Sequence, residues 1–238
     1  SDVAREAAGI VLLDDDFATL VAGVREGRRI YDNIRKAMAF VVAVHIPIAG
    51  IALAAAAAGW PLILLPVHIL FLEMVIDPAC TIVFEADPEE SDVMTLPPRP
   101  PAEPILGRAA LGLSVLRGSV AFACAFAAAL WAMSEGWSEG RVRAVAFSII
   151  VLLNLALIFA SLCGRRGVLA TLRTPNPALW WTFAGAVLML ALADGTAALR
   201  TVFHFGPLGA AGLALVAGAA VTGFASMLAL GRFMRREA

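Results

Sequence analysis

Charged residues are scarce in this 238-residue chain, at 16% of the total, and it contains only three cysteines. A soluble domain has about a quarter of its residues charged, so this scarcity argues against a large soluble core. The net charge of −1 gives no indication of a nucleic-acid partner, and we expect none. The cysteines lie singly in apolar runs, without the spacing of a zinc site or of a disulfide framework. We interpret them as packing residues.

Hydrophobic residues are abundant, at 61% of the chain, and the mean hydropathy is +0.85. Long apolar runs alternate with short polar breaks, which is typical of a polytopic helical membrane protein. Runs of about 20 residues suffice to cross ~30 Å of hydrocarbon as helices. We therefore predict an all-α membrane protein in a lipid bilayer, with a bundle of six transmembrane helices at about 37–58, 62–84, 113–133, 143–163, 178–199 and 207–230.

The segment before the first span predicts a short strand followed by a helix. The apolar run Ala8–Leu13 is typical of a buried strand, and the three aspartates that follow it suit a helix N-cap. From Phe17 onward apolar residues recur at helical spacing, and no proline interrupts residues 17–46. We expect a cytoplasmic stalk helix that runs into the membrane, and we divide the chain into 1–36 and a membrane domain, 37–238.

Arginine and lysine set the expected orientation. If the N-terminal segment is cytoplasmic, the outer loops hold only Arg141, Arg143 and Arg200. The cytoplasmic side then holds Arg25, Arg28, Arg29, Arg35, Lys36, Arg99, Arg108, Arg165, Arg166, Arg173, Arg232, Arg235 and Arg236. This bias follows the positive-inside rule and predicts a multi-pass protein of the cell membrane with both termini in the cytoplasm.

Two acidic residues in the second span are the main candidates for function. Glu73 and Asp77 are four residues apart and share one helix face. Two carboxylates in a membrane repel each other, so one must take a proton or a cation must lie between them. Pro78 weakens the helix there and leaves the carbonyl of Met74 without its helical donor, so a bound ion is one possible partner for that carbonyl. The alternative is a simple kink, with the acids facing a water-filled gap.

Three further polar residues lie within spans. His45 is interpreted as a ligand, a proton acceptor or a buried neutral histidine, and the nearby Pro47 should free the carbonyl of Ala43. Asn154 lies in the middle of the fourth span, where it either supports an ion site or forms an interhelical hydrogen bond. His68 is expected at the outer membrane interface. The candidate metal-binding set is therefore Glu73, Asp77, His45 and Asn154.

Two sequence blocks resemble P-type cation-transporting ATPases of the calcium-pump-like branch. VAREAAGIVLLDDDFATLVAGVREGRRIYDNIRK is similar to the end of their phosphorylation domain and stalk. LPVHILFLEMVIDPACTIVFEADPEESDVMTLPPRPPAEPIL is similar to their sixth membrane helix and the loop after it. The resemblance implies that the six spans are the family's last six and that the protein is an ATP-driven cation pump.

The resemblance also implies roles for particular residues. Glu73 and Asp77 stand at the positions of the ion-binding Asn and Asp of the sixth helix. His45 and Ile48 stand where the fifth helix offers an Asn and a Glu, and Asn154 stands at the eighth-helix Glu. The loss of carboxylates at the second of the two calcium sites implies one transported ion per cycle. Calcium is a candidate ion, although Glu and His replace the usual amides.

The family's other motifs do not occur in the chain. These are the phosphorylated Asp of DKTGT, the actuator and nucleotide-binding segments, the magnesium loop and the fourth-helix ligand segment. We expect a missing N-terminal portion of the same protein, with the ATP and Mg²⁺ sites outside this chain and no catalytic residue within it. Two alternatives stay open: a secondary transporter or proton-relay module, and a non-pumping truncated fragment.

Overall fold

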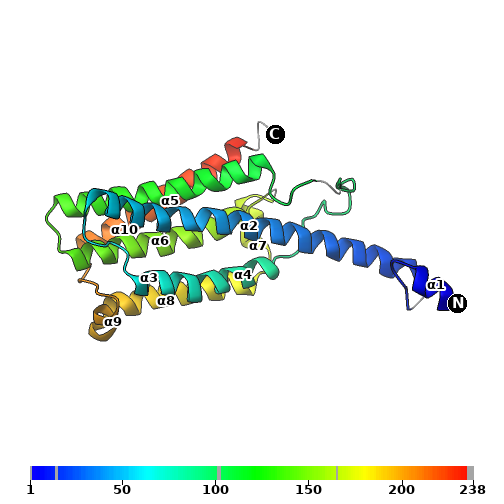
Figure 1. The fold of residues 1–238 in the computed structure, drawn as a ribbon, viewed down its shortest axis with the longest axis horizontal. Helices are drawn as coiled ribbons and strands as arrows, with labels where there is room; N and C mark the ends of the chain where they lie inside the picture. Colours follow the sequence, from blue (N-terminus) through cyan, green and yellow to red (C-terminus); the bar gives the residue numbers. More distant parts are fainter. Residues whose placement is uncertain (1, 14–15, 101–102, 165, 235–238) are drawn as a thin grey trace.

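The structure is a computed structural model that describes residues 2–13, 16–100, 103–164 and 166–234. All of the regular secondary structure in its described part is helical (Figure 1). The elements are α1 (Asp2–Ala7), α2 (Phe17–Ala58), α3 (Pro66–Phe71), the π-helical turn η1 (Leu72–Ile76), α4 (Asp77–Glu85), α5 (Arg108–Ser134), α6 (Glu139–Leu162), α7 (Val168–Arg173), α8 (Pro177–Gly195), α9 (Ala197–Val202) and α10 (Gly209–Met234). The predicted all-α class is confirmed.

The short strand predicted at Ala8–Leu13 is wrong. These residues follow α1 as irregular chain, and Ile10 and Leu13 are exposed. A strand needs a neighbouring strand to pair its backbone N–H and C=O groups, and the described residues supply none. Within the described residues, the apolar run therefore has no strand to pair with, and most of it is exposed.

The uninterrupted helix predicted from Phe17 is present as α2. Asp16 caps α2 as predicted, because its side chain accepts a hydrogen bond from the Ala18 N–H at 2.8 Å. The other two candidate caps, residues 14 and 15, lie outside the described residues. The helix then runs unbroken for 42 residues to its cap at Gly59, which takes a left-handed φ of 65°. We call its first part, residues 17–36, the stalk.

Five of the described helices are long and apolar enough to cross a membrane: α2, α5, α6, α8 and α10. α5, α6, α8 and α10 begin and end within about five residues of predicted spans, and α2 contains the whole of the predicted first span, 37–58. The predicted second span, 62–84, is instead divided into α3, η1 and α4. Pro66 starts α3, and Pro78 is the second residue of α4, directly after the π-helical turn. The exact count of six is therefore not confirmed by the helices themselves.

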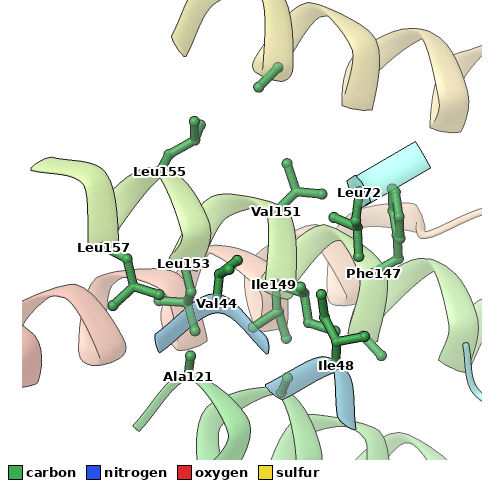
Figure 2. Packing of buried hydrophobic residues seen from close by; sticks show 14 of the residues in the cluster. Val44, Ile48, Leu72, Ala121, Phe147, Ile149, Val151, Leu153, Leu155 and Leu157 are labelled. Carbon is green, nitrogen blue, oxygen red and sulfur yellow. The ribbon is translucent and has the colours of Figure 1, made fainter. Parts of the chain in front are cut away.

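Helix α6 is the centre of the bundle. In its apolar window 89% of residues are buried, compared with 33% or less in each of the other four long helices. Figure 2 shows Val44 and Ile48 of α2 and Ala121 of α5 gathered around α6. The stalk, the chain after α4, α7 and the end of α10 lie at one end of the bundle, which we call the stalk end (Figure 1).

Pro47 lies inside α2 without ending it. Because proline has no N–H, the carbonyl of Ala43 lacks its helical donor. That carbonyl is next to Gly118 of α5: a β-carbon built on Gly118 would lie 2.5 Å from the Ala43 oxygen. The Ala43 carbonyl therefore points at the backbone of α5, and Gly118 permits the close approach of α5 to α2.

We expect Gly118→Ala to lower the free energy of unfolding by about 1–3 kcal/mol, because the two helix backbones must move apart. Gly112→Ala, on the same helix with nothing within 4 Å of the added carbon, is the matched control. It should be neutral or stabilising by up to about 1 kcal/mol. Thermal unfolding in detergent compares the two variants, and equal midpoints would contradict the close contact.

Candidate functional site

His45 of α2 and Glu73 of η1 lie opposite each other. His45 Nε2 is 3.4 Å from Glu73 Oε1, and His45 Nδ1 is 2.8 Å from the carbonyl oxygen of Val41. Glu73 is the second residue of the π-helical turn. Such a turn holds one more residue than an α-helical turn and is frequent at functional sites. The structure thus brings together two of the four predicted site residues, from two different helices.

The geometry fixes one proton of His45. A carbonyl oxygen only accepts hydrogen bonds, so Nδ1 carries the hydrogen that is donated to Val41. In the neutral imidazole Nε2 is then a bare acceptor that lies 3.4 Å from Glu73 Oε1. Both atoms can take a proton or bind a cation, so a cation bound by the Glu73 carboxylate would compete with any proton held between them.

The pair opens onto the surface of the chain. The side chain of His45 is 48% exposed and that of Glu73 is 40% exposed. Asp77, predicted to share a helix face with Glu73, is the first residue of α4, but its side chain lies outside the described part of the structure. Among the side chains that are described, no three His, Cys, Asp or Glu residues are grouped tightly enough to hold a metal ion.

Asn154 is fully buried in α6. Neither its amide oxygen nor its amide nitrogen has a hydrogen-bond partner within the described chain. The interhelical hydrogen bond that was the simpler expectation is therefore not formed among these residues. An unpartnered buried amide costs about 1–3 kcal/mol, so this side chain is available for a ligand at the expense of stability.

Replacing Asn154 by Leu should therefore raise the free energy of unfolding by about 1–2 kcal/mol, measured in detergent without added transport cations. Asn176→Leu is the matched control. Asn176 is also buried, but its amide donates to the Val83 carbonyl at 3.0 Å and accepts from the Leu179 N–H at 3.1 Å. The control should lose stability, and equal losses in both variants would contradict the unpartnered state of Asn154.

His68, expected at the outer membrane interface, is buried inside the protein near the start of the second predicted span. His68 is completely buried between Phe147, Phe203 and Phe205. Its Nδ1 accepts from the Leu65 N–H at 3.0 Å, so its Nε2 donates to the Phe203 carbonyl at 2.7 Å. Both ring nitrogens are satisfied within the protein, and His68 fixes the start of α3.

A second group of ionisable side chains was missed by the sequence analysis. Lys36, Asp87, Glu90 and Arg166 meet at the stalk end, where their side chains are 14%, 2%, 5% and 10% exposed. The sequence analysis used Lys36 and Arg166 only for orientation and treated 85–112 as an extended connection. The available signal was an acidic pair, three residues apart, shortly after the second apolar segment.

Comparison with known proteins places this arrangement in a family. Residues 61–233 match the family described as cation transporting ATPase, C-terminus. The chain is 32% identical over 160 residues to a probable cation-transporting ATPase F of Mycobacterium tuberculosis and 35% identical over 162 residues to a calcium-transporting ATPase of Bacillus subtilis. Each alignment covers 67% of this chain and 18% of the relative.

A P-type sodium-transporting ATPase4 of Toxoplasma gondii is 40% identical over 108 residues, which is 45% of this chain and 8% of the relative. The relatives are thus named for different cations, and the chain spans about a fifth or less of the length of each. The match to the family covers most of the apolar helices described above. This chain belongs to the cation-transporting ATPases and corresponds to their carboxy-terminal membrane region.

Proposed function

We propose that this chain is the membrane transport domain of an ATP-driven cation pump and that Glu73, Asp77, His45 and Asn154 contribute to its intramembrane cation site. The observation that carries the proposal is the His45–Glu73 pair, with atoms 3.4 Å apart at a π-helical break between apolar helices. A carboxylate at such a place costs at least ~2.5–3.5 kcal/mol to desolvate. A bound cation or proton offsets that cost.

The donor set suits a hard cation. Carboxylate and amide oxygens bind calcium, magnesium, manganese and sodium ions better than soft metals such as copper. Asp77 begins α4 four residues after Glu73, so both carboxylates belong to the broken segment. Asn154 supplies an amide oxygen from the central helix that no described protein group uses. Calcium is one candidate ion.

The membrane topology is part of the proposal. We place α3, η1 and α4 together across the membrane as a sixth span, since Pro66–Glu85 is 20 residues long. Residues 1–36 then form the end of a phosphorylation domain and the stalk, and residues 37–238 form the membrane domain. The excess of Arg and Lys at the stalk end supports a cytoplasmic position for that end and for both termini.

The exposure of the His45–Glu73 pair indicates that another part of the protein packs against it. A side chain such as Glu73, which is 40% exposed in this chain, would be costly against lipid. We propose that the N-terminal portion of a full-length pump covers this face and holds the ATP and Mg²⁺ sites. ATP hydrolysis, and with it any enzyme activity, belongs to that full-length protein.

Two experiments test the proposed function. The reading frame upstream of this chain should encode a DKTGT motif, and a start codon at or near Ser1 would count against a pump. ATP hydrolysis by the purified full-length protein should be stimulated by one cation in a screen of calcium, magnesium, manganese, sodium and pH. An absence of stimulation by every ion would refute the proposal.

The pump's apparent affinity for its cation should rise with pH. A proton held between His45 Nε2 and Glu73 Oε1 would compete with the ion for the carboxylate, so we expect the affinity to increase by up to about tenfold per pH unit. His45→Gln should flatten this dependence. Cation titrations of ATP hydrolysis at several pH values measure both effects, and an affinity independent of pH in the unmodified protein would show that no proton is displaced.

The close approach of His45 and Glu73 also favours a second candidate function, a proton-relay module that works without ATP. This chain, reconstituted in liposomes, would then carry protons or cations down a gradient. The pump proposal predicts no such flux from the chain alone.

A further inference from the structure

The four side chains at the stalk end form a closed ring of ion pairs, the ionic ring. Lys36 Nζ lies 2.6 Å from Asp87 Oδ2 and 3.0 Å from Glu90 Oε1. Arg166 Nη1 lies 3.0 Å from Asp87 Oδ1, and its Nε lies 3.0 Å from Glu90 Oε2. Each carboxylate thus contacts both cations, all four carboxylate oxygens are used, and the formal charges cancel.

Stability alone does not account for the ionic ring. Removing four charges from water costs several kcal/mol for each, and the attraction between them rarely does more than offset this cost. Well-packed apolar side chains would often hold the same place as firmly. Buried ion pairs have a better-attested use in setting the register between elements, because they are satisfied in only one arrangement.

Each residue of the ionic ring belongs to, or directly follows, a helix that carries part of the proposed cation site. Lys36 lies nine residues before His45 on α2, about 13 Å along a continuous helix. Asp87 and Glu90 follow the end of α4, the helix that continues from Glu73 and η1. Arg166 follows the end of α6, the helix of Asn154. Three site-bearing segments therefore meet in one buried cluster.

Neighbouring hydrogen bonds support the same junction. Asn33 of the stalk donates to the Asp87 carbonyl at 2.8 Å, and Arg29 donates to the carbonyls of Glu85 and Asp87 at 3.2 and 3.3 Å. Arg166 also donates to the carbonyl of Pro88. The end of α4 is thus held from the α2 side and from the α6 side, while the π-helical turn that carries Glu73 lies beyond it.

We propose that the ionic ring of Lys36, Asp87, Glu90 and Arg166 sets the relative axial positions of α2, α4 and α6 and thereby places His45, Glu73 and Asn154 for cation binding. The four residues are positioning residues: they do not touch the ion. The effect on cation binding rests on the proposed function. The effect on helix position rests only on the geometry of the ionic ring.

The first test measures helix position without any transport activity. In the full-length protein, spin labels at Ile34→Cys on α2 and Ile82→Cys on α4, both exposed positions in this chain, report the distance between the helices. Lys36→Met should shift or broaden the distance distribution, and Lys36→Arg should restore it. The protein without introduced cysteines controls for labelling of its native thiols. An unchanged distribution in Lys36→Met would overturn the proposal, whether or not the protein pumps.

The second test separates positioning from stability. In titrations of ATP hydrolysis with Ca²⁺, Mn²⁺ or Na⁺, Lys36→Met should raise the half-saturating concentration about 10–100-fold, the range for residues that orient metal ligands. Lys36→Met/Asp87→Asn removes one cation and one anion, so thermal stability should recover towards the unmodified protein while cation affinity does not. Recovery of both together would show that the ionic ring only holds the fold.

Arg25→Met is the matched control for both tests. Arg25 is another stalk cation facing the same connection, but its pair with Glu89 is 3.7 Å long and largely exposed. Exposed pairs contribute about 0–1 kcal/mol, so this variant should keep the distance distribution and the cation affinity within about twofold. A failure of the unmodified protein to respond to any cation would refute the proposed function alone, and the distance measurement would still decide the role of the ionic ring.

Discussion

The full-length protein with Asp77→Asn is expected to lose cation-stimulated ATP hydrolysis completely. Asp77 is the first residue of α4, directly after the π-helical turn that carries Glu73. The substitution keeps the shape of the side chain and removes one of the two carboxylates of the proposed site, which would offset the charge of the ion. Two unit charges 4 Å apart attract by about 4 kcal/mol at an effective dielectric constant of 20, so losing one carboxylate is severe.

The measurement for Asp77→Asn is cation-dependent formation of the phosphorylated protein from ATP. Glu103→Gln is the matched control, because Glu103 is an exposed acid paired only with a nearby surface arginine, Arg99, in the described structure. The control should phosphorylate as the unmodified protein does. Normal cation-dependent phosphorylation of Asp77→Asn would remove Asp77 from the site.

Glu73→Gln is expected to lower the apparent cation affinity by about 100-fold or more, which corresponds to ~2.7 kcal/mol. It also removes the partner of His45 Nε2 at 3.4 Å. The pH dependence of the remaining affinity should therefore weaken along with the affinity itself. Cation titrations at two pH values in one preparation measure both effects. A reduced affinity with an unchanged pH dependence would separate the cation site from any proton held between His45 and Glu73.

The sequence predicted the long helices well because their signal is local. An apolar run of about 20 residues must form a helix in a membrane, because its backbone N–H and C=O groups have no water to bind. Accordingly, α2, α5, α6, α8 and α10 begin and end close to the predicted residues. The strand at Ala8–Leu13 failed for the opposite reason, because a strand depends on a partner elsewhere. The π-helical turn at Leu72–Ile76 also escaped prediction, since proline spacing indicates a weak point but not how the backbone adapts.

The candidate site was predictable only in part. A charge inside an apolar run makes Glu73 a candidate functional residue, and the structure places it 3.4 Å from His45, another residue of the candidate set. The ionic ring could not be found in this way, because Lys36, Asp87 and Arg166 come from three distant segments. Polar loops give no periodic signal, so only the packing of α2, α4 and α6 shows that these charges meet.

The central claim is that Glu73 forms part of the cation site of an ATP-driven pump. The most direct test is ATP-dependent uptake of calcium, manganese or sodium ions into proteoliposomes that contain the full-length protein, with Glu73→Gln compared at equal protein content. We predict uptake of one of these cations that requires ATP and that Glu73→Gln reduces strongly at low cation concentration. Equal ATP-dependent uptake by both proteins across the whole concentration range would contradict the claim.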